Sequence, residues 1–220
     1  MSAVKPVRFK DWVCFHCTRC ADCCRGLEGN LMLEPADAYD LARVLRAQGK
    51  AGSIHDVYER YATVDLLEGR LPIYLVNTVG DNHACIFLED GRCSVYEGRP
   101  QMCRSYPFFA CPGERGKAFE VFQCVDDHAA HFTDGKVLVK DWLHENFSKE
   151  RRAIMTAETV VLPELGRLLQ SVNFNEDKAG LFQSLHYRYY NYDLDEPFLP
   201  QYMSNMAALE KFLREGTGES

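Results

Sequence analysis

The residues best suited to chemistry in this sequence are its ten cysteines, all of which lie within residues 14–124. Five of them form a first cluster that starts at Cys14 and reads Cys-Phe-His-Cys-Thr-Arg-Cys-Ala-Asp-Cys-Cys. A step of three residues matches neither the 3.6-residue period of a helix nor the two-residue period of a strand, so packing does not explain it. Cysteines at this spacing can wrap around a metal ion or cluster. The metal ligands predicted in this cluster are Cys17, Cys20, Cys23 and Cys24.

The cysteine doublet that ends this cluster is its unusual part. Adjacent side chains generally diverge. Cys23 and Cys24 are therefore expected to serve different metals, or to divide into one ligand and one supporting thiol.

A second group of predicted ligands consists of Cys85, Cys93 and Cys103. The turn sequence Glu-Asp-Gly-Arg at residues 89–92 predicts a hairpin, with Cys85 and Cys93 on its facing arms. Cys103 can return to them from the loop that follows Pro100.

Two arginines and two further cysteines extend this second group. Arg99 and Arg104 lie close to its thiols in the sequence, and a positive side chain lowers the pKa of a thiol. The alternative for each arginine is a solvated guanidinium or one paired to a carboxylate.

Cys111 and Cys124 complete the predicted ligands, although each is equally compatible with a buried thiol.

The number of thiols bears on the kind of metal centre. The first two groups hold more cysteines than one tetrahedral ion needs, which indicates two sites or bridging sulfur. A donor set dominated by sulfur favours iron–sulfur, zinc or Cu(I). We expect iron or an iron–sulfur cluster as the cofactor, with zinc as the alternative. A disulfide scaffold is disfavoured, because no apolar signal segment follows the basic residues 1–10.

Four motifs follow one another in the order Phe15-x-Cys-x-x-Cys-x-x-Cys-Cys, Cys85-x-Phe-Leu, Gly91-Arg-Cys-x-x-Tyr and Arg99-Pro-x-x-Cys-Arg-x-Tyr-Pro-Phe. Over residues 12–125 this pattern resembles the YkgJ-type CxxCxxCC cysteine-cluster family, which is distantly similar to flagellin lysine-N-methylase. The resemblance implies a domain that chelates zinc or iron. The family pattern usually has glycine where this chain has Ala21, and it does not include Cys14.

The rest of the sequence predicts an α+β fold, in which a small antiparallel sheet with cysteine-rich loops packs with several helices. Residues 12–33 are expected to be rich in loops. Pro35 and Gly49 delimit a helix over residues 34–48. A capping box that starts at Ser53 predicts a second helix, which continues to about residue 68. Strands are predicted over residues 71–79, 84–88, 93–96 and 118–123, and further helices over 137–160, 163–171, 177–190 and 201–214.

Charge and hydropathy limit the partners of the chain. A formal net charge of −7 argues against nucleic acid, because phosphate binding needs basic surfaces. The longest apolar runs are shorter than ten residues, whereas a membrane helix needs about 20, so no membrane association is predicted. The lack of a signal segment predicts a cytoplasmic protein. The cysteine distribution predicts a metal-binding domain at residues 1–135 and a helical C-terminal extension, 136–220, packed on it.

These features predict a cysteine-cluster metalloprotein that binds iron or an iron–sulfur cluster through thiolates. The alternative is a zinc-binding structural or interaction module without catalysis. Enzymatic activity is left open, because the sequence has no glycine-rich phosphate loop and no Ser-His-Asp signature. Metal ions are the partners that the sequence predicts.

Overall fold

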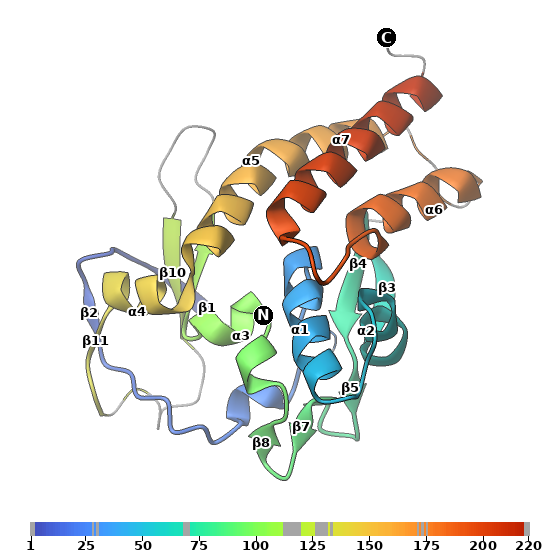
Figure 1. Cartoon of the computed structure of the whole chain (residues 1–220). Helices are drawn as coiled ribbons and strands as arrows, with labels where there is room; N and C mark the ends of the chain where they lie inside the picture. The colour runs from blue at the N-terminus through green and yellow to red at the C-terminus, as the bar shows by residue number, and fades with distance from the viewer. Residues whose placement is uncertain are drawn as a thin grey trace.

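The computed structural model describes residues 3–27, 29, 31–67, 71–111, 120–125, 132, 134–170, 172, 174 and 176–217. The fold is α+β, as predicted, with small antiparallel ladders surrounded by helices. Figure 1 shows α5 (Lys149–Leu169) and α7 (Phe198–Thr217) running side by side, with α1 (Pro35–Ala47) below them.

The largest sheet has three strands in the order β1-β10-β9. These are β1 (Ala3–Val7), β10 (Glu120–Val125) and β9 (Phe108–Cys111), and both pairings are antiparallel. Only β10 lies near a predicted strand; the sequence analysis missed β1 and β9. β1 was missed because it contains Pro6. Proline is tolerated in an edge strand such as β1, but it weakens a strand prediction from sequence.

Four short two-stranded ladders complete the β-structure. They are β2 (Trp12–Val13) with β11 (Val137–Leu138), β3 (Ala62–Leu67) with β4 (Leu71–Val76), β5 (Thr78–Val79) with β6 (Ala84–Cys85), and β7 (Leu88–Glu89) with β8 (Arg92–Cys93). The β2–β11 ladder joins the N-terminal part of the chain to the start of the C-terminal helical region.

Local sequence signals fix the ends of the first two helices. Pro35 occupies the first turn of α1, where its missing N–H costs nothing. α2 (Ile54–Tyr61) begins with the predicted capping box, in which Ser53 and Asp56 satisfy each other's backbone N–H groups. The remaining helices are α3 (Gln101–Ser105), α4 (Val139–Asn146) and α6 (Lys178–Leu185), with a π-helical turn over His186–Tyr190.

Several predicted boundaries are wrong. The second helix ends at Tyr61, because residues 62–67 form β3 and pair residue for residue with β4. The predicted strand over 71–79 is interrupted at Asn77 and divides into β4 and β5. The predicted helix over 137–160 breaks at Ser148, which caps α5 by accepting a hydrogen bond from the Arg151 N–H. α5 then continues through Pro163, where the sequence predicts a new helix.

The core of the described chain has two parts. The larger part joins apolar residues of α1 and α2 to those of α5 and α7, and it includes Leu41, Tyr58, Leu168 and Leu209. The smaller part lies between the three-stranded sheet and α4, around Phe108, Val121, Val139, Leu143 and Phe147. Full burial of each large apolar side chain contributes roughly 1.5–3 kcal/mol. No helix among the described residues combines the length and the apolar character needed to cross a membrane.

We predict that Glu158 makes the protein less stable as the pH rises. The pKa of this α5 carboxyl is raised from 4.5 to about 7, mainly by burial and also by nearby Glu34, while Arg188 acts to lower it. The folded protein therefore binds a proton that the unfolded chain releases, so this group's contribution to stability falls between about pH 4.5 and pH 7.

Urea unfolding at pH 5 and pH 8 tests this expectation. Glu158→Gln should flatten the decline and raise the free energy of unfolding at pH 8, whereas Glu145→Gln, at an exposed position of α4, should change neither. Parallel pH profiles for Glu158→Gln and the wild type would contradict it.

Candidate metal centre

Six of the predicted cysteine ligands line one cavity of about 430 Å³. They come from three stretches of the chain that are separate in sequence, and they are Cys17, Cys23, Cys24, Cys85, Cys93 and Cys103. In Figure 1 the turn that carries the doublet lies beside α3 and the β7–β8 hairpin. The first and second cysteine groups therefore meet at one place.

The first stretch reaches the cavity through a strained loop. Ala21 has φ 63°, in the left-handed region that favours glycine, and the 3₁₀ turn Asp22–Cys24 follows directly. This geometry explains why the family pattern described above has glycine at this position. The doublet converges rather than diverges, because Cys23 and Cys24 line the same cavity.

Backbone hydrogen bonds hold this first stretch against the second. The N–H groups of Gly26 and Leu27 donate to the carbonyls of Asn82 and His83, at 2.9 and 3.1 Å. These carbonyls lie just before Cys85 in the chain. Two segments about 60 residues apart are thereby joined immediately next to their cysteines.

The second stretch contains the predicted hairpin, but in a different register. The turn at Asp90 and Gly91 has positive φ at both residues, as a two-residue hairpin requires. Cys93 pairs with Leu88 across this hairpin, whereas Cys85 pairs with Thr78 in the preceding ladder. The two thiols share the cavity without lying on facing arms of one hairpin.

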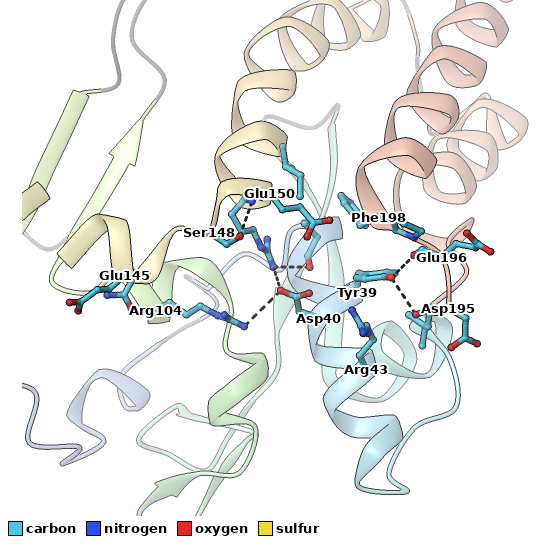
Figure 2. A pocket seen from close by; sticks show the side chains of 16 residues that line it. Tyr39, Asp40, Arg43, Arg104, Glu145, Ser148, Glu150, Asp195, Glu196 and Phe198 are labelled. Carbon is cyan, nitrogen blue, oxygen red and sulfur yellow. Dashed lines mark hydrogen bonds and ion pairs between the residues drawn. The ribbon is translucent and has the colours of Figure 1, made fainter. Parts of the chain in front are cut away.

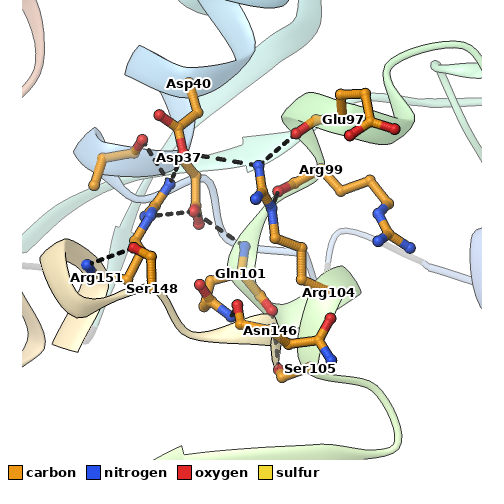
Figure 3. A network of polar contacts seen from close by, with 11 residues as sticks. Asp37, Asp40, Glu97, Arg99, Gln101, Arg104, Ser105, Asn146, Ser148 and Arg151 are labelled. Carbon is orange, nitrogen blue, oxygen red and sulfur yellow. Dashed lines mark hydrogen bonds and ion pairs between the residues drawn. The ribbon is translucent and has the colours of Figure 1, made fainter. Parts of the chain in front are cut away.

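The third stretch is held against α1. Gly98 packs so tightly on this helix that an added Cβ would lie 2.9 Å from Cγ2 of Val44. The carboxylate of Asp37 accepts a hydrogen bond of 3.0 Å from the N–H of Gln101, the first residue of α3. Two contacts with α1 thus position the short helix that carries Cys103 (Figure 3).

Arg151 connects this third stretch to the C-terminal helices. Its guanidinium lies 2.8 Å from Asp37 and 2.7 Å from Asp40, and it also donates to the Ala36 carbonyl (Figure 3). The Asp37 side chain is almost fully buried, and burial raises its pKa to about 6 although Arg151 and the Gln101 N–H lower it. Asp37 therefore depends on Arg151 for compensation of its charge.

The surroundings of four thiols in this cavity raise their pKa values and so disfavour the thiolate form. Burial raises the pKa values of Cys85, Cys93 and Cys103, and the hydrogen bond with Cys24 followed by burial raises that of Cys23. Cys23 acts on the pKa values of Cys85, Cys93 and Cys103, and Cys24 acts on that of Cys23, as expected for groups that share one space. A bound cation is what would displace their protons.

Arginines provide positive charge on one wall of the cavity. Arg99 acts against the upward pKa shifts of Cys23 and Cys93, as the sequence analysis anticipated for an arginine near the thiols. Its guanidinium lies 3.6 Å from the Tyr96 ring centre, and Arg19 lies 4.5 Å from the same ring. Arg104 instead donates to the carbonyls of Arg99 and Glu97 and lies 3.8 Å from the carboxylate of Asp40, so the alternative of a carboxylate partner is confirmed for this arginine.

Two other predicted ligands, Cys20 and Cys124, are not among the residues that line the cavity, and the side chain of Cys111 lies outside the described part of the structure. Cys20 is exposed and does not line the cavity, and its carbonyl accepts a hydrogen bond from Arg25. Cys124 lies in β10 opposite Val4. The backbone of Cys111 pairs with Glu120, four residues from Cys124 along β10. Ligation by these three cysteines stays a prediction.

A polar cleft of about 460 Å³ lies between α1 and the N-terminal ends of α5 and α7 (Figure 2). α3 contributes Arg104 to this cleft and Cys103 to the cysteine cavity. The hydroxyl of Tyr39 closes one side by donating to the carbonyls of Leu194 and Glu196. Its lining contains charges of both signs but no thiol, so thiolate chemistry belongs to the cysteine cavity.

Comparison with known families agrees with the cysteine geometry. Residues 16–129, just over half of the chain, match the CxxCxxCC family, described as "Putative zinc- or iron-chelating domain". This chain belongs to the CxxCxxCC family. The matched region contains every cysteine of the chain except Cys14, and thus all six that line the cavity.

No curated protein and no solved structure is significantly similar to this CxxCxxCC chain. The expected similarity to flagellin lysine-N-methylase is therefore not supported. Metal binding through cysteine is the property that family membership supports, and the family description names zinc and iron together.

We predict that Ala21 tolerates glycine but not a β-branched residue. Valine at φ 63° would be strained, with a cost of roughly 1–2 kcal/mol or more, and would displace the doublet. Ala21→Val should lower both the urea midpoint and the metal content, while Ala21→Gly should retain metal. Wild-type metal content and stability in Ala21→Val would show that the turn geometry is not required.

Removal of the Arg151 guanidinium should destabilise the protein strongly. Arg151→Met leaves the buried Asp37 carboxylate without its cation, which costs roughly 3–5 kcal/mol. Chemical denaturation measures this loss, and the double variant Asp37→Asn/Arg151→Met should recover part of it. A loss below about 1 kcal/mol in the single variant would rule out this role.

Proposed function

We propose that this chain binds iron through cysteine thiolates, as an iron–sulfur cluster or a related iron centre, in the cavity between its three cysteine stretches. The observation that carries the proposal is the convergence of six thiols on one space of about 430 Å³. The central ligands in this proposal are Cys23, Cys85, Cys93 and Cys103, with Cys17 and Cys24 beside them.

The number and spacing of the thiols favour a group larger than one ion. A tetrahedral zinc site uses four ligands at about 2.3 Å, so its sulfurs stand only about 3.8 Å apart. The six thiols that line this cavity exceed the four that one such ion binds. An iron–sulfur cluster spans a wider space, because its inorganic sulfides separate the metal atoms that the thiolates bind.

The surroundings of the thiols suit an anionic cluster. Arg19, Arg92 and Arg99 line the cavity and offset the negative charge of several thiolates. The apolar side chains of Leu31, Val76, Phe87 and Val95 line the same cavity. Burial and nearby charge are the means by which a protein sets the potential of a bound cluster.

A bound cluster would supply electron transfer or Lewis-acid chemistry, and the chain's own residues would hold it and limit access of water. We place this function in the cytoplasm, where a reducing environment keeps thiols available to metal. We also retain the division of the chain proposed from its sequence. In it, residues 1–135 bind the metal, and 136–220 support that part through contacts such as Arg151 with Asp37.

The second candidate function is a zinc-stabilised structural or interaction module. Its support is that Cys23, Cys85, Cys93 and Cys103 line one cavity and that the first three act on the pKa of Cys103, since four cysteines are a complete ligand set for structural zinc. In this case the metal contributes directly to folding and leaves no open position for a substrate.

Metal analysis of protein purified without oxygen separates the two candidates. The iron proposal predicts a brown protein with iron, acid-labile sulfide and a cluster-type Mössbauer spectrum. A colourless protein with stoichiometric zinc would establish the alternative instead. A folded protein that takes up neither metal would refute both.

We predict that Cys85→Ser and Cys103→Ser each lower metal affinity by more than about tenfold and reduce stability in parallel. Both thiols line the cavity, whereas Cys14 is exposed and lies outside it. Cys14→Ser is therefore the matched control and should retain the wild-type metal content. Equal metal content in all three variants would remove Cys85 and Cys103 from the ligand set.

A further inference from the structure

A second, mostly apolar cavity lies next to the smaller core, away from the cysteines. It encloses about 340 Å³ between α4, the start of α5 and the three-stranded sheet. Leu143 and Phe147 line it from α4, Ala110 from β9, and Met155 from α5, while the partly exposed Phe9 adds an aromatic ring. No residue lines both this cavity and the cysteine cavity.

Among the described residues, the polar side chains that line this cavity are all basic. They are Lys140, His144 and Arg152. Lys140 and His144 share one helical face with Leu143 and Phe147, because residues three or four apart lie together on a helix. No aspartate or glutamate among the described residues lines the cavity. A described lining with basic but no acidic side chains is unusual for a chain with a net charge of −7.

These basic groups have no carboxylate partner within the described part of the chain. The guanidinium of Arg152 donates to the Phe147 carbonyl at the end of α4, which holds it beside the cavity. Lys140 and His144 are exposed and form no ion pair with a described acidic residue. The positive charge at the cavity is therefore available to a ligand.

We propose that this cavity binds a small anionic amphiphile, a molecule with one carboxylate and an apolar body, such as a medium-chain fatty acid. The apolar walls would take the chain, and Lys140 and Arg152 would bind the carboxylate, with His144 as a further donor. The volume lies within the range of small-molecule sites, which are mostly apolar with a few polar groups that fix orientation.

The charge of the surrounding groups selects this class of ligand. A neutral apolar molecule would gain no ionic contact with the basic groups, and a cationic amphiphile would be repelled by them. The proposal does not depend on the metal, because the two cavities share no residue.

Calorimetric titration of the full-length, metal-loaded protein with decanoate, below its micellar concentration, tests the proposal. We expect saturable binding with one site, and binding at least about tenfold weaker for 1-decanol and decyltrimethylammonium. Lys140→Gln and Arg152→Gln should each weaken decanoate binding by about tenfold. Lys211→Gln, on the exposed surface of α7, is the matched control and should bind as the wild type does.

A variant that fills the cavity tests the apolar part separately. Ala110→Leu should abolish decanoate binding while circular dichroism shows an unchanged fold. Equal affinity for all three ligands, or unchanged decanoate binding in Lys140→Gln and Arg152→Gln, would overturn the proposal. A dimer in sedimentation that Lys140→Glu dissociates would assign the cavity to a second copy of the chain, and would likewise overturn it.

Discussion

The buried carboxylate of Asp37 is the interaction on which the arrangement of the cysteine site depends most. It accepts the first N–H of α3, which carries Cys103, and it pairs with Arg151 at the start of α5. One side chain of α1 thus joins a cysteine stretch to the C-terminal helices. Because a buried charge without a partner is costly, this carboxylate constrains both neighbours at once.

The rest of the site follows from the need to hold together cysteine stretches that have little regular secondary structure. Short ladders, a strained turn and close backbone contacts replace the extended hydrogen bonding of a large sheet. The contacts of Gly26 and Leu27 with residues 82–83, and of Gly98 with α1, act next to the cysteines themselves. A metal centre that bridges all three stretches would add covalent connections where the protein provides few of its own.

Much of this site could be predicted from the sequence, because cysteine spacing and turn residues are local signals. The meeting of Cys85, Cys93 and Cys103, the Asp90–Gly91 turn and the capping box at Ser53 were predicted in this way. The left-handed Ala21 could be inferred only indirectly, from the glycine of the family pattern. That glycine marks a backbone conformation rather than a ligand.

The features that the sequence did not predict depend on distant parts of the chain. Residues 62–67 form a strand because β4 is available to pair with them, which overrides the helical pattern before it. Arg99 and Arg104 are equivalent in the sequence, yet the first lines the cysteine cavity while the second turns to backbone carbonyls. The ion pair of Arg151 with Asp37 could not be predicted, because it depends on how α5 packs against α1. No local sequence pattern gives that packing.

X-ray absorption at the metal edge of anaerobically purified protein tests the central claim most directly. Our account predicts a first coordination shell made of sulfur at about 2.3 Å, with iron neighbours beyond it if a cluster is bound. A first shell dominated by nitrogen or oxygen would contradict the claim that the thiols of this cavity hold the metal.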